Sequence, residues 1–199
     1  MTSPYVQNII DLHPGVHFFL GQAQSGKTTL MQYVLDQWPG HSLAVDRNST
    51  NPPAAKHLAR YGTWWSEKLP DALPPGTSAV ACDECAEYTK EMDEQAKPGE
   101  PGHLIYQLVR RGQHQLPHGV TALLGSQRPM DIGMDAWGQA KTVTIGKIIG
   151  DSDLRRVASL PGVSREMVAW LPHLKPGWFM VWHESGRIEL PRCILDGGA

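Results

Sequence analysis

Nine residues near the N-terminus have the types and the spacing of a phosphate-binding loop, in the order Gly21-Gln22-Ala23-Gln24-Ser25-Gly26-Lys27-Thr28-Thr29. They fit the pattern G-x-x-x-x-G-K-[ST]. Gly21 and Gly26 carry no Cβ, so the backbone can come close to phosphate oxygens. The loop amides and the N-terminus of the following helix offer N–H groups and positive dipole to an anion. We therefore expect Lys27 to contact the β- and γ-phosphates of ATP, and the Thr28 hydroxyl to bind Mg²⁺.

Two adjacent acids form the second candidate site. Asp83 and Glu84 follow a short apolar run, residues 78–82, which is the Walker B pattern. Asp83 is predicted to help hold Mg²⁺ through water. Glu84 is predicted to orient and deprotonate the water that attacks the γ-phosphorus. Cys82 and Cys85 form a C-x-x-C around these acids, but a zinc site is not expected because the chain has no second such pair.

Polar residues after two further segments complete the candidate site. Gln127 and Arg128 follow an apolar run over residues 120–126, and Gln127 is predicted to contact the γ-phosphate or the attacking water. Residues 104–109 have the apolar spacing of a packed helix, which ends in Arg110-Arg111-Gly112. The two arginines have two interpretations. They are either cations favoured at a helix C-terminus or an arginine finger for a neighbouring subunit's nucleotide.

The elements that must position these residues alternate between strand and helix. Strands are predicted at residues 16–20, 41–46, 78–84, 120–126 and 142–148, and a terminal hairpin at 178–190. Helices are predicted after residue 29, at 54–61, in the charged segment 86–97, from Asp151 and at 164–171. Residues 1–14 are expected to be a turn-rich segment on the edge of the fold. The alternation predicts an α/β fold. We expect a single domain over 1–199, with a core at about 15–150 and C-terminal helices and hairpin at about 151–199.

Composition limits the function classes. The chain has 199 residues and a net charge of −2. Residues 1–100 carry 7 Lys and Arg against 12 Asp and Glu, whereas residues 101–199 carry 11 against 8. The basic excess of the second half allows nucleic-acid binding but does not establish it. We expect no transmembrane segment and no signal peptide. The three cysteines favour a reducing compartment over a disulfide framework.

The order of these motifs resembles one family. A phosphate loop, an Asp-Glu strand, a helix ending Arg-Arg-Gly and a strand ending Gly-Ser-Gln-Arg-Pro are similar to those of the FtsK–HerA superfamily of additional-strand P-loop ATPases. Within it, the chain most resembles the genome-packaging ATPases of tailless icosahedral double-stranded DNA viruses with internal membranes. The resemblance runs from about Val16 through the C-terminal hairpin.

The resemblance implies a fold and a function. The fold would be a three-layer α/β sandwich with a mostly parallel sheet, strand order 5-1-4-3-2, plus a C-terminal β-hairpin. The activity would be ATP hydrolysis with Mg²⁺, coupled to translocation of double-stranded DNA by a ring, expected to be a hexamer. Gln127 would be the sensor and Arg111 or Arg110 a finger acting in trans, although Gly112-Gln113 stands where related chains often have Gly-Arg. A viral portal or membrane vertex protein would be a partner, and the protein would work in the infected cell's cytoplasm or at the virion vertex.

Other classes remain open from the sequence. A phage morphogenesis ATPase of the zonula-occludens-toxin type would move single-stranded DNA, but such chains usually carry a transmembrane segment. A thymidine-kinase-like nucleoside kinase also pairs a phosphate loop with Asp-Glu, but it would need zinc cysteines. A helicase core would need a second lobe. A structural role would require Lys27, Asp83 and Glu84 to be idle.

Overall fold

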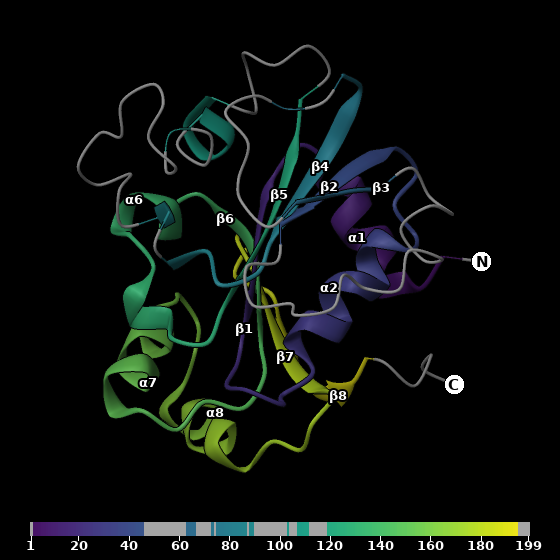
Figure 1. The fold of residues 1–199 in the computed structure, drawn as a ribbon. Coiled ribbons are helices and arrows are strands. Elements are labelled where there is room, and N and C mark those ends of the chain that lie inside the picture. The colour runs from purple at the N-terminus through teal and green to yellow at the C-terminus, as the bar shows by residue number, and fades with distance from the viewer. Residues whose placement is uncertain are drawn as a thin grey trace.

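One mixed β-sheet organises the chain (Figure 1). The structure, a computed structural model, describes residues 2–45, 63–66, 73, 75–86, 88–89, 103, 107–111 and 119–194. Within these ranges the sheet has eight strands in the order β3-β2-β4-β5-β1-β6-β7-β8. They are β1 (Val16–Leu20), β2 (His41–Val45), β3 (Thr63–Ser66), β4 (Thr77–Cys82), β5 (Thr121–Ser126), β6 (Ala140–Ile145), β7 (Trp178–His183) and β8 (Ile188–Cys193).

The predicted strand order is confirmed. Counted over the five strands expected from the sequence, 5-1-4-3-2 corresponds to β6-β1-β5-β4-β2, and all of these strands are parallel. The short strand β3 adds a parallel neighbour at the outer edge of β2. In register, Leu20 of β1 lies beside Ser126 of β5 and Ile145 of β6. The carboxyl ends of these three strands therefore meet at one edge of the sheet, where α/β folds bind ligands.

Helices cover both faces of the sheet and make three layers (Figure 1). Helices α1 (Pro4–Asp11) and α2 (Lys27–Leu35) lie on one face. On the other lie α6 (Met134–Trp137), α7 (Asp151–Ala158) and α8 (Arg165–Trp170), with the short turns η1 (Gln107–Arg111), η2 (Pro129–Asp131) and η3 (Leu171–His173). The predicted three-layer α/β class is confirmed. The helix predicted at 54–61 lies outside the described residues, and so does most of the helix predicted at 86–97.

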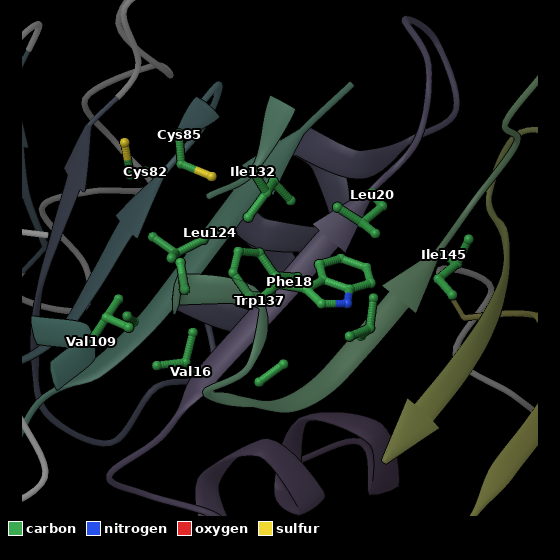
Figure 2. Close-up of a cluster of buried hydrophobic side chains, with 14 of the residues drawn as sticks. Val16, Phe18, Leu20, Cys82, Cys85, Val109, Leu124, Ile132, Trp137 and Ile145 are labelled. Atoms are coloured by element: carbon green, nitrogen blue, oxygen red, sulfur yellow. The ribbon is translucent and has the colours of Figure 1, made fainter. Parts of the chain in front are cut away.

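The core on the α7 side fixes the position of β1 (Figure 2). Phe18 is fully buried, and its ring centroid lies 5.9 Å from that of Trp137. Leu124 of β5 and Ile145 of β6 pack in the same cluster and are also fully buried. Full burial of such a side chain contributes about 1.5–3 kcal/mol. Because β1 is packed on both faces, the position of Leu20 is fixed, and so is the start of the loop that follows it.

The N-terminal prediction was wrong. Residues 4–11 form helix α1, and its buried residues Tyr5, Val6 and Ile9 pack on the face of the sheet rather than at its edge. The Ser3 side chain accepts a hydrogen bond from the Val6 amide, and Pro4 occupies the first turn. Ser at the N-cap and Pro at the first helical position are a helix-start signal that could have been recognised in the sequence.

The C-terminal hairpin is confirmed, and it extends the sheet. β7 pairs antiparallel with β6, and β8 pairs antiparallel with β7. The predicted helices at 151–157 and 164–171 are α7 and α8, the latter capped by Ser164. The helix expected over 104–109 is described only from Gln107, where the chain is π-helical and buries Leu108 and Val109.

A histidine is buried in the middle of the sheet. His17 of β1 has no exposed surface, and its Nδ1 lies 2.9 Å from the Thr142 hydroxyl. Its Nε2 has no hydrogen-bond partner among the described residues. Burial lowers the pKa of His17 to about 3, and His183, Lys141 and His13 nearby add to this effect. The imidazole is therefore neutral in the folded protein at neutral pH.

We expect His17 to make the protein less stable in acid. The unfolded chain binds a proton at His17 below pH 6.5, whereas the folded chain does so only near pH 3. Stability is therefore lost as the pH falls through this window, by up to about 1.4 kcal/mol per pH unit from this residue. In His17→Gln, the free energy of unfolding in urea should fall less steeply between about pH 6.5 and 4.5 than in the wild type.

The exposed residue His173 in η3 provides the control, because His173→Gln should leave the wild-type slope unchanged. Equal slopes for His17→Gln and the wild type would mean that His17 is not held neutral in the folded state.

Candidate active site

The predicted phosphate loop joins β1 to α2. Its first amides are held by the neighbouring strands, since the Gly21 N–H donates to the Ser126 carbonyl at 3.2 Å and the Gln22 N–H to the Lys147 carbonyl at 2.9 Å. The Ser25 N–H donates to the Gln22 carbonyl at 3.1 Å and closes the turn. The loop therefore wraps over the carboxyl ends of β5 and β6, with α2 beginning at Lys27.

Glycine is needed at both ends of this loop. Gly26 has φ = 94°, in the left-handed region, and it is the N-cap of α2. A Cβ on Gly21 would lie 2.5 Å from the Ser25 hydroxyl oxygen. Side chains at either position would change the path of the backbone, and the amides at the start of α2 would no longer face a bound phosphate.

The C-terminal hairpin supports the loop from behind, a role that the sequence analysis missed. The Gly177 N–H, directly before β7, donates to the Ser25 carbonyl at 2.9 Å. A Cβ on Gly146 would lie 3.0 Å from the Phe179 ring and 3.3 Å from the Ser25 Cβ. The turn-forming pair Pro176-Gly177 predicts a turn before the hairpin, but no local signal predicts that this turn contacts a loop so distant in the sequence.

The two predicted acids meet the loop lysine. The Lys27 ammonium forms an ion pair with Asp83 Oδ1 and lies 3.3 Å from Glu84 Oε1. The Thr28 hydroxyl donates to Asp83 Oδ2. The side chains of Lys27, Asp83 and Glu84 are 5%, 12% and 26% exposed. The ammonium is thus largely withdrawn from water and is shared between two carboxylates.

The acids are placed by the strands on each side of β4. The Asp83 N–H donates to the Val45 carbonyl at 3.0 Å, and the Cys85 N–H to the Gly125 carbonyl at 2.8 Å. Between them, Glu84 has φ = 55°, a left-handed conformation that costs a non-glycine residue about 1–3 kcal/mol. Such outliers cluster at functional sites, because the surrounding structure must hold them.

Gly125 allows the close approach of Asp83 to β5. A Cβ on Gly125 would lie 2.5 Å from Asp83 Oδ1 and 2.8 Å from the Met31 sulfur of α2. The sequence analysis included Gly125 only as part of a strand. Its function is to leave space between β5, the acids and α2.

Gln127 lies at the same site. Its Nε2 donates to Glu84 Oε1 at 2.8 Å, so Glu84 is held by both Gln127 and Lys27. A cavity of about 400 Å³ opens over these groups. Its lining consists of loop and strand-end residues, namely Gln22, Ala23, Gln24, Gly26, Lys27, Thr28, Thr29, Asp83, Glu84 and Gln127. The structure therefore brings together the predicted residues of the loop, the Asp-Glu pair and Gln127.

The oxygen donors in this cavity fit magnesium. Thr28 Oγ1 and Asp83 Oδ2 are in hydrogen-bond contact, and a hydroxyl and a carboxylate are hard ligands of the kind that Mg²⁺ prefers. Within the described ranges, no three His, Cys, Asp or Glu residues are grouped as a metal site. An ion here would thus take Thr28 as a ligand, Asp83 directly or through water, and the remainder from water and phosphate oxygens. It would supply positive charge to the phosphates.

The cysteines beside the acids are packed in the core. Cys82 and Cys85 are both buried, and neither forms a disulfide bond within the described residues (Figure 2). Burial raises the pKa of the Cys85 thiol well above its ordinary value. A protonated, buried thiol is a poor nucleophile and a poor metal ligand.

The predicted arginine pair is only partly described. Arg110 and Arg111 lie in the π-helical turn η1, but their side chains are outside the described part of the structure, as is Gly112. The arginine-finger assignment therefore stays a prediction.

Comparisons with known proteins agree with this architecture. No family model matches the chain, and no curated protein matches it in sequence. Among solved structures, the DNA-packaging ATPase B204 from Sulfolobus Turreted Icosahedral Virus aligns with a TM-score of 0.68 and 15% identity, over 92% of this chain and 100% of that chain. The genome-packaging NTPase B204 from Sulfolobus turreted icosahedral virus 2, in complex with ATP-gammaS, aligns with a TM-score of 0.62 and 17% identity, over 92% and 98%.

A larger protein contains the same fold. The conjugation coupling protein TcpA of pCW3 aligns with a TM-score of 0.58 and 14% identity, over 94% of this chain and 62% of that chain. The additional-strand order, the hairpin on β6 and the loop at the strand ends are features of this chain's own structure. Its structural neighbours thus include viral genome-packaging ATPases and a conjugation coupling protein, whose fold it shares.

Proposed function

We propose that this protein hydrolyses ATP and uses the energy to move double-stranded DNA during the packaging of a viral genome. The observation that carries the proposal is the convergence of Lys27, Asp83, Glu84 and Gln127 on one phosphate loop. A chance glycine-rich turn would not have two acids from another strand against its lysine and an amide from a third strand bonded to one of those acids.

The residues have separate roles in the reaction. A water attacks the γ-phosphorus, the bond from that phosphorus to the bridging oxygen of ADP breaks, and the water's proton passes to the Glu84 carboxylate. Lys27 binds the β- and γ-phosphate oxygens, and Thr28 and Asp83 hold Mg²⁺. Gln127 donates a hydrogen bond to Glu84 at 2.8 Å, a contact that supports its proposed role as a sensor of the γ-phosphate.

Two observations support the DNA part of the proposal. Structural neighbours include proteins described as DNA-packaging ATPases and a conjugation coupling protein, and the second half of the chain carries the basic excess. The proposed assembly is a ring, expected to be a hexamer, that contacts a viral portal or membrane vertex protein in the infected cell or at the virion vertex. In the part of the chain that the structure describes, no helix is long and apolar enough to cross a bilayer.

A ring would allow one subunit to complete the site of the next. Arg111, with Arg110 as the alternative, is proposed as the finger that acts in trans. Its place in η1, just before β5 in the chain, agrees with the family's order of elements. A finger of this kind can raise turnover by about 10³-fold or more.

Substitutions at the loop and at Glu84 should have different effects on binding and turnover. Lys27→Ala should abolish Mg²⁺-dependent ATP hydrolysis, because the ammonium contacts the γ-phosphate. Glu84→Gln should keep ATP affinity near wild type and reduce kcat by roughly 10²-fold or more, because an amide cannot take the water's proton. Phosphate release and fluorescent-nucleotide binding measure the two effects.

Exposed residues of α8 supply matched controls. Arg165→Ala and Glu166→Gln remove the same charges away from the cavity and should keep wild-type hydrolysis. Wild-type activity in Lys27→Ala would refute the proposed hydrolysis, and an equal loss of affinity and turnover in Glu84→Gln would make Glu84 a binding or structural residue.

We expect DNA binding that does not depend on sequence and weakens steeply with salt. Contacts to phosphates release counterions, so log K should fall linearly with log salt, with a slope of about −0.9 per phosphate neutralised. Fluorescence anisotropy with two duplexes of unrelated sequence, in the presence of a non-hydrolysable ATP analogue, measures both properties. A motor for double-stranded DNA is contradicted if neither duplex binds at low salt.

Arg111→Ala should bind ATP, but its rate of ATP hydrolysis should be roughly 10³-fold lower than that of the wild type. When it is mixed with Glu84→Ala, some activity should return. The Arg111→Ala subunit keeps its own Glu84 and can receive an arginine from its neighbour. Verified mixed rings with no recovered activity would mean that the arginine does not act in trans or that turnover requires several complete sites. Full activity of Arg111→Ala would transfer the role to Arg110 and then to Arg128.

A further inference from the structure

A second cavity lies beside the nucleotide cavity. It measures about 530 Å³ and shares three lining residues with the first cavity, Gln22, Ala23 and Gln127. Gln22 and Ala23 stand at the start of the phosphate loop, whereas Thr29 lines the first cavity at the loop's other end. Gln127 is bonded to Glu84, which is proposed to activate the attacking water. The shared wall therefore lies at the end of the site where the γ-phosphate reacts.

Arg128 lines this second cavity, and its backbone is fixed. The Arg128 N–H donates to the Ser126 hydroxyl oxygen at 3.1 Å, and that hydroxyl lies 3.1 Å from the Arg128 carbonyl. The side chain is 61% exposed. The base of the side chain is thus anchored directly beside Gln127, whereas its guanidinium can change position.

Two carboxylates hold the guanidinium only loosely. Arg128 Nε lies 3.8 Å from Asp131 Oδ2 and 3.8 Å from Asp153 Oδ2. Charge-assisted hydrogen bonds between such groups measure about 2.7–2.9 Å, so neither contact is a close one. Asp153 itself is fixed, since it is 8% exposed and its Oδ1 accepts the Met130 N–H at 3.0 Å. Exposed ion pairs of this quality contribute about 0–1 kcal/mol, so their loss costs little.

Acidic side chains outnumber basic ones among the described residues that line the two cavities. Among the described residues that line them, Lys27 and Arg128 are the basic side chains, against the acids Asp83, Glu84 and Asp153. Lys27 is already shared between Asp83 and Glu84. A bound γ-phosphate would bring more negative charge to the shared wall, and Arg128 is the described cation next to it that has no close partner among the described carboxylates.

We propose that Arg128 acts on the nucleotide of its own subunit. As the bond to ADP breaks, its guanidinium leaves Asp131 and Asp153 and donates hydrogen bonds to oxygens of the transferring phosphoryl group from the side of Gln22 and Ala23. The inference rests on the proposed ATP hydrolysis and adds a catalytic residue in cis. Arg128 exchanges no proton. It neutralises charge on the phosphoryl group while the bond to ADP breaks, and the water's proton goes to Glu84.

Nucleotide analogues separate this role from a structural one. Arg128→Ala should keep ATP-gammaS affinity near wild type, lower kcat by roughly 10²- to 10³-fold and lose the tight binding of ADP with aluminium fluoride, which mimics the transferring phosphoryl group. Arg128→Lys should recover only part of kcat, because an ammonium cannot bind two oxygens in the guanidinium's planar fork. Arg155→Ala, at an exposed site on α7, is the matched control and should behave as wild type.

Three results would overturn the inference. They are wild-type kcat in Arg128→Ala, an equal loss of ATP-gammaS and aluminium fluoride affinity, and recovery of activity when Arg128→Ala is mixed with Glu84→Gln. Recovery on mixing would mean action in trans, because in cis no site of a mixed assembly has both residues. A protein that does not assemble and still loses turnover on Arg128→Ala supports action in cis.

The proposed function is tested alongside by Lys27→Ala and Glu84→Gln. If these variants hydrolyse ATP as wild type does, ATP hydrolysis at this site fails, whatever Arg128 does. If they are inactive while Arg128→Ala is fully active, only the inference about Arg128 fails.

Discussion

The site depends on the contacts that the Asp83 carboxylate makes. It pairs with the Lys27 ammonium, accepts a hydrogen bond from the Thr28 hydroxyl, and accepts the Glu84 N–H at 3.0 Å. Its own backbone is held by Val45 of β2 at 3.0 Å. One carboxylate thereby ties the start of α2 to the ends of β4 and β2. The phosphate loop at Lys27, the proposed magnesium ligand Thr28 and the turn that carries Glu84 are all held by contacts with this one carboxylate.

The packing around Asp83 explains why the sheet is built as it is. Parallel strands place their carboxyl ends at one edge, so side chains from β1, β4 and β5 can meet there although they are distant in sequence. Gly125 leaves the space that Asp83 and Met31 need, and Glu84 is held at φ = 55° by the hydrogen bonds on each side of it. The strain at Glu84 and the missing side chain at Gly125 both cost stability. Burial of the apolar core on both faces of β1 contributes stability that offsets these costs.

The sequence predicted the parts of this structure that local patterns determine. The phosphate loop, the acid pair after β4, the residue Gln127 after β5 and the hairpin follow from motifs and apolar runs, and the order of the strands followed from the family resemblance. Helix α1 was not predicted because the many polar residues of this segment favoured a turn-rich interpretation, although Ser3-Pro4 is a capping signal. The support of Ser25 by Gly177 and the cavity beside Arg128 could not be predicted, since they depend on distances between segments that no local pattern encodes.

The same contacts suggest how nucleotide binding changes the site. Without phosphate, the single Lys27 ammonium is shared between two carboxylates, Asp83 and Glu84, and offsets only part of their negative charge. Breaking such a pair alone would be costly, because it leaves charges unpaired in a site with little water. A magnesium–ATP complex bound as proposed would change this balance, because its cation would interact with Asp83 and its phosphates with Lys27. Glu84 would then lose one of its two partners and keep its hydrogen bond to Gln127.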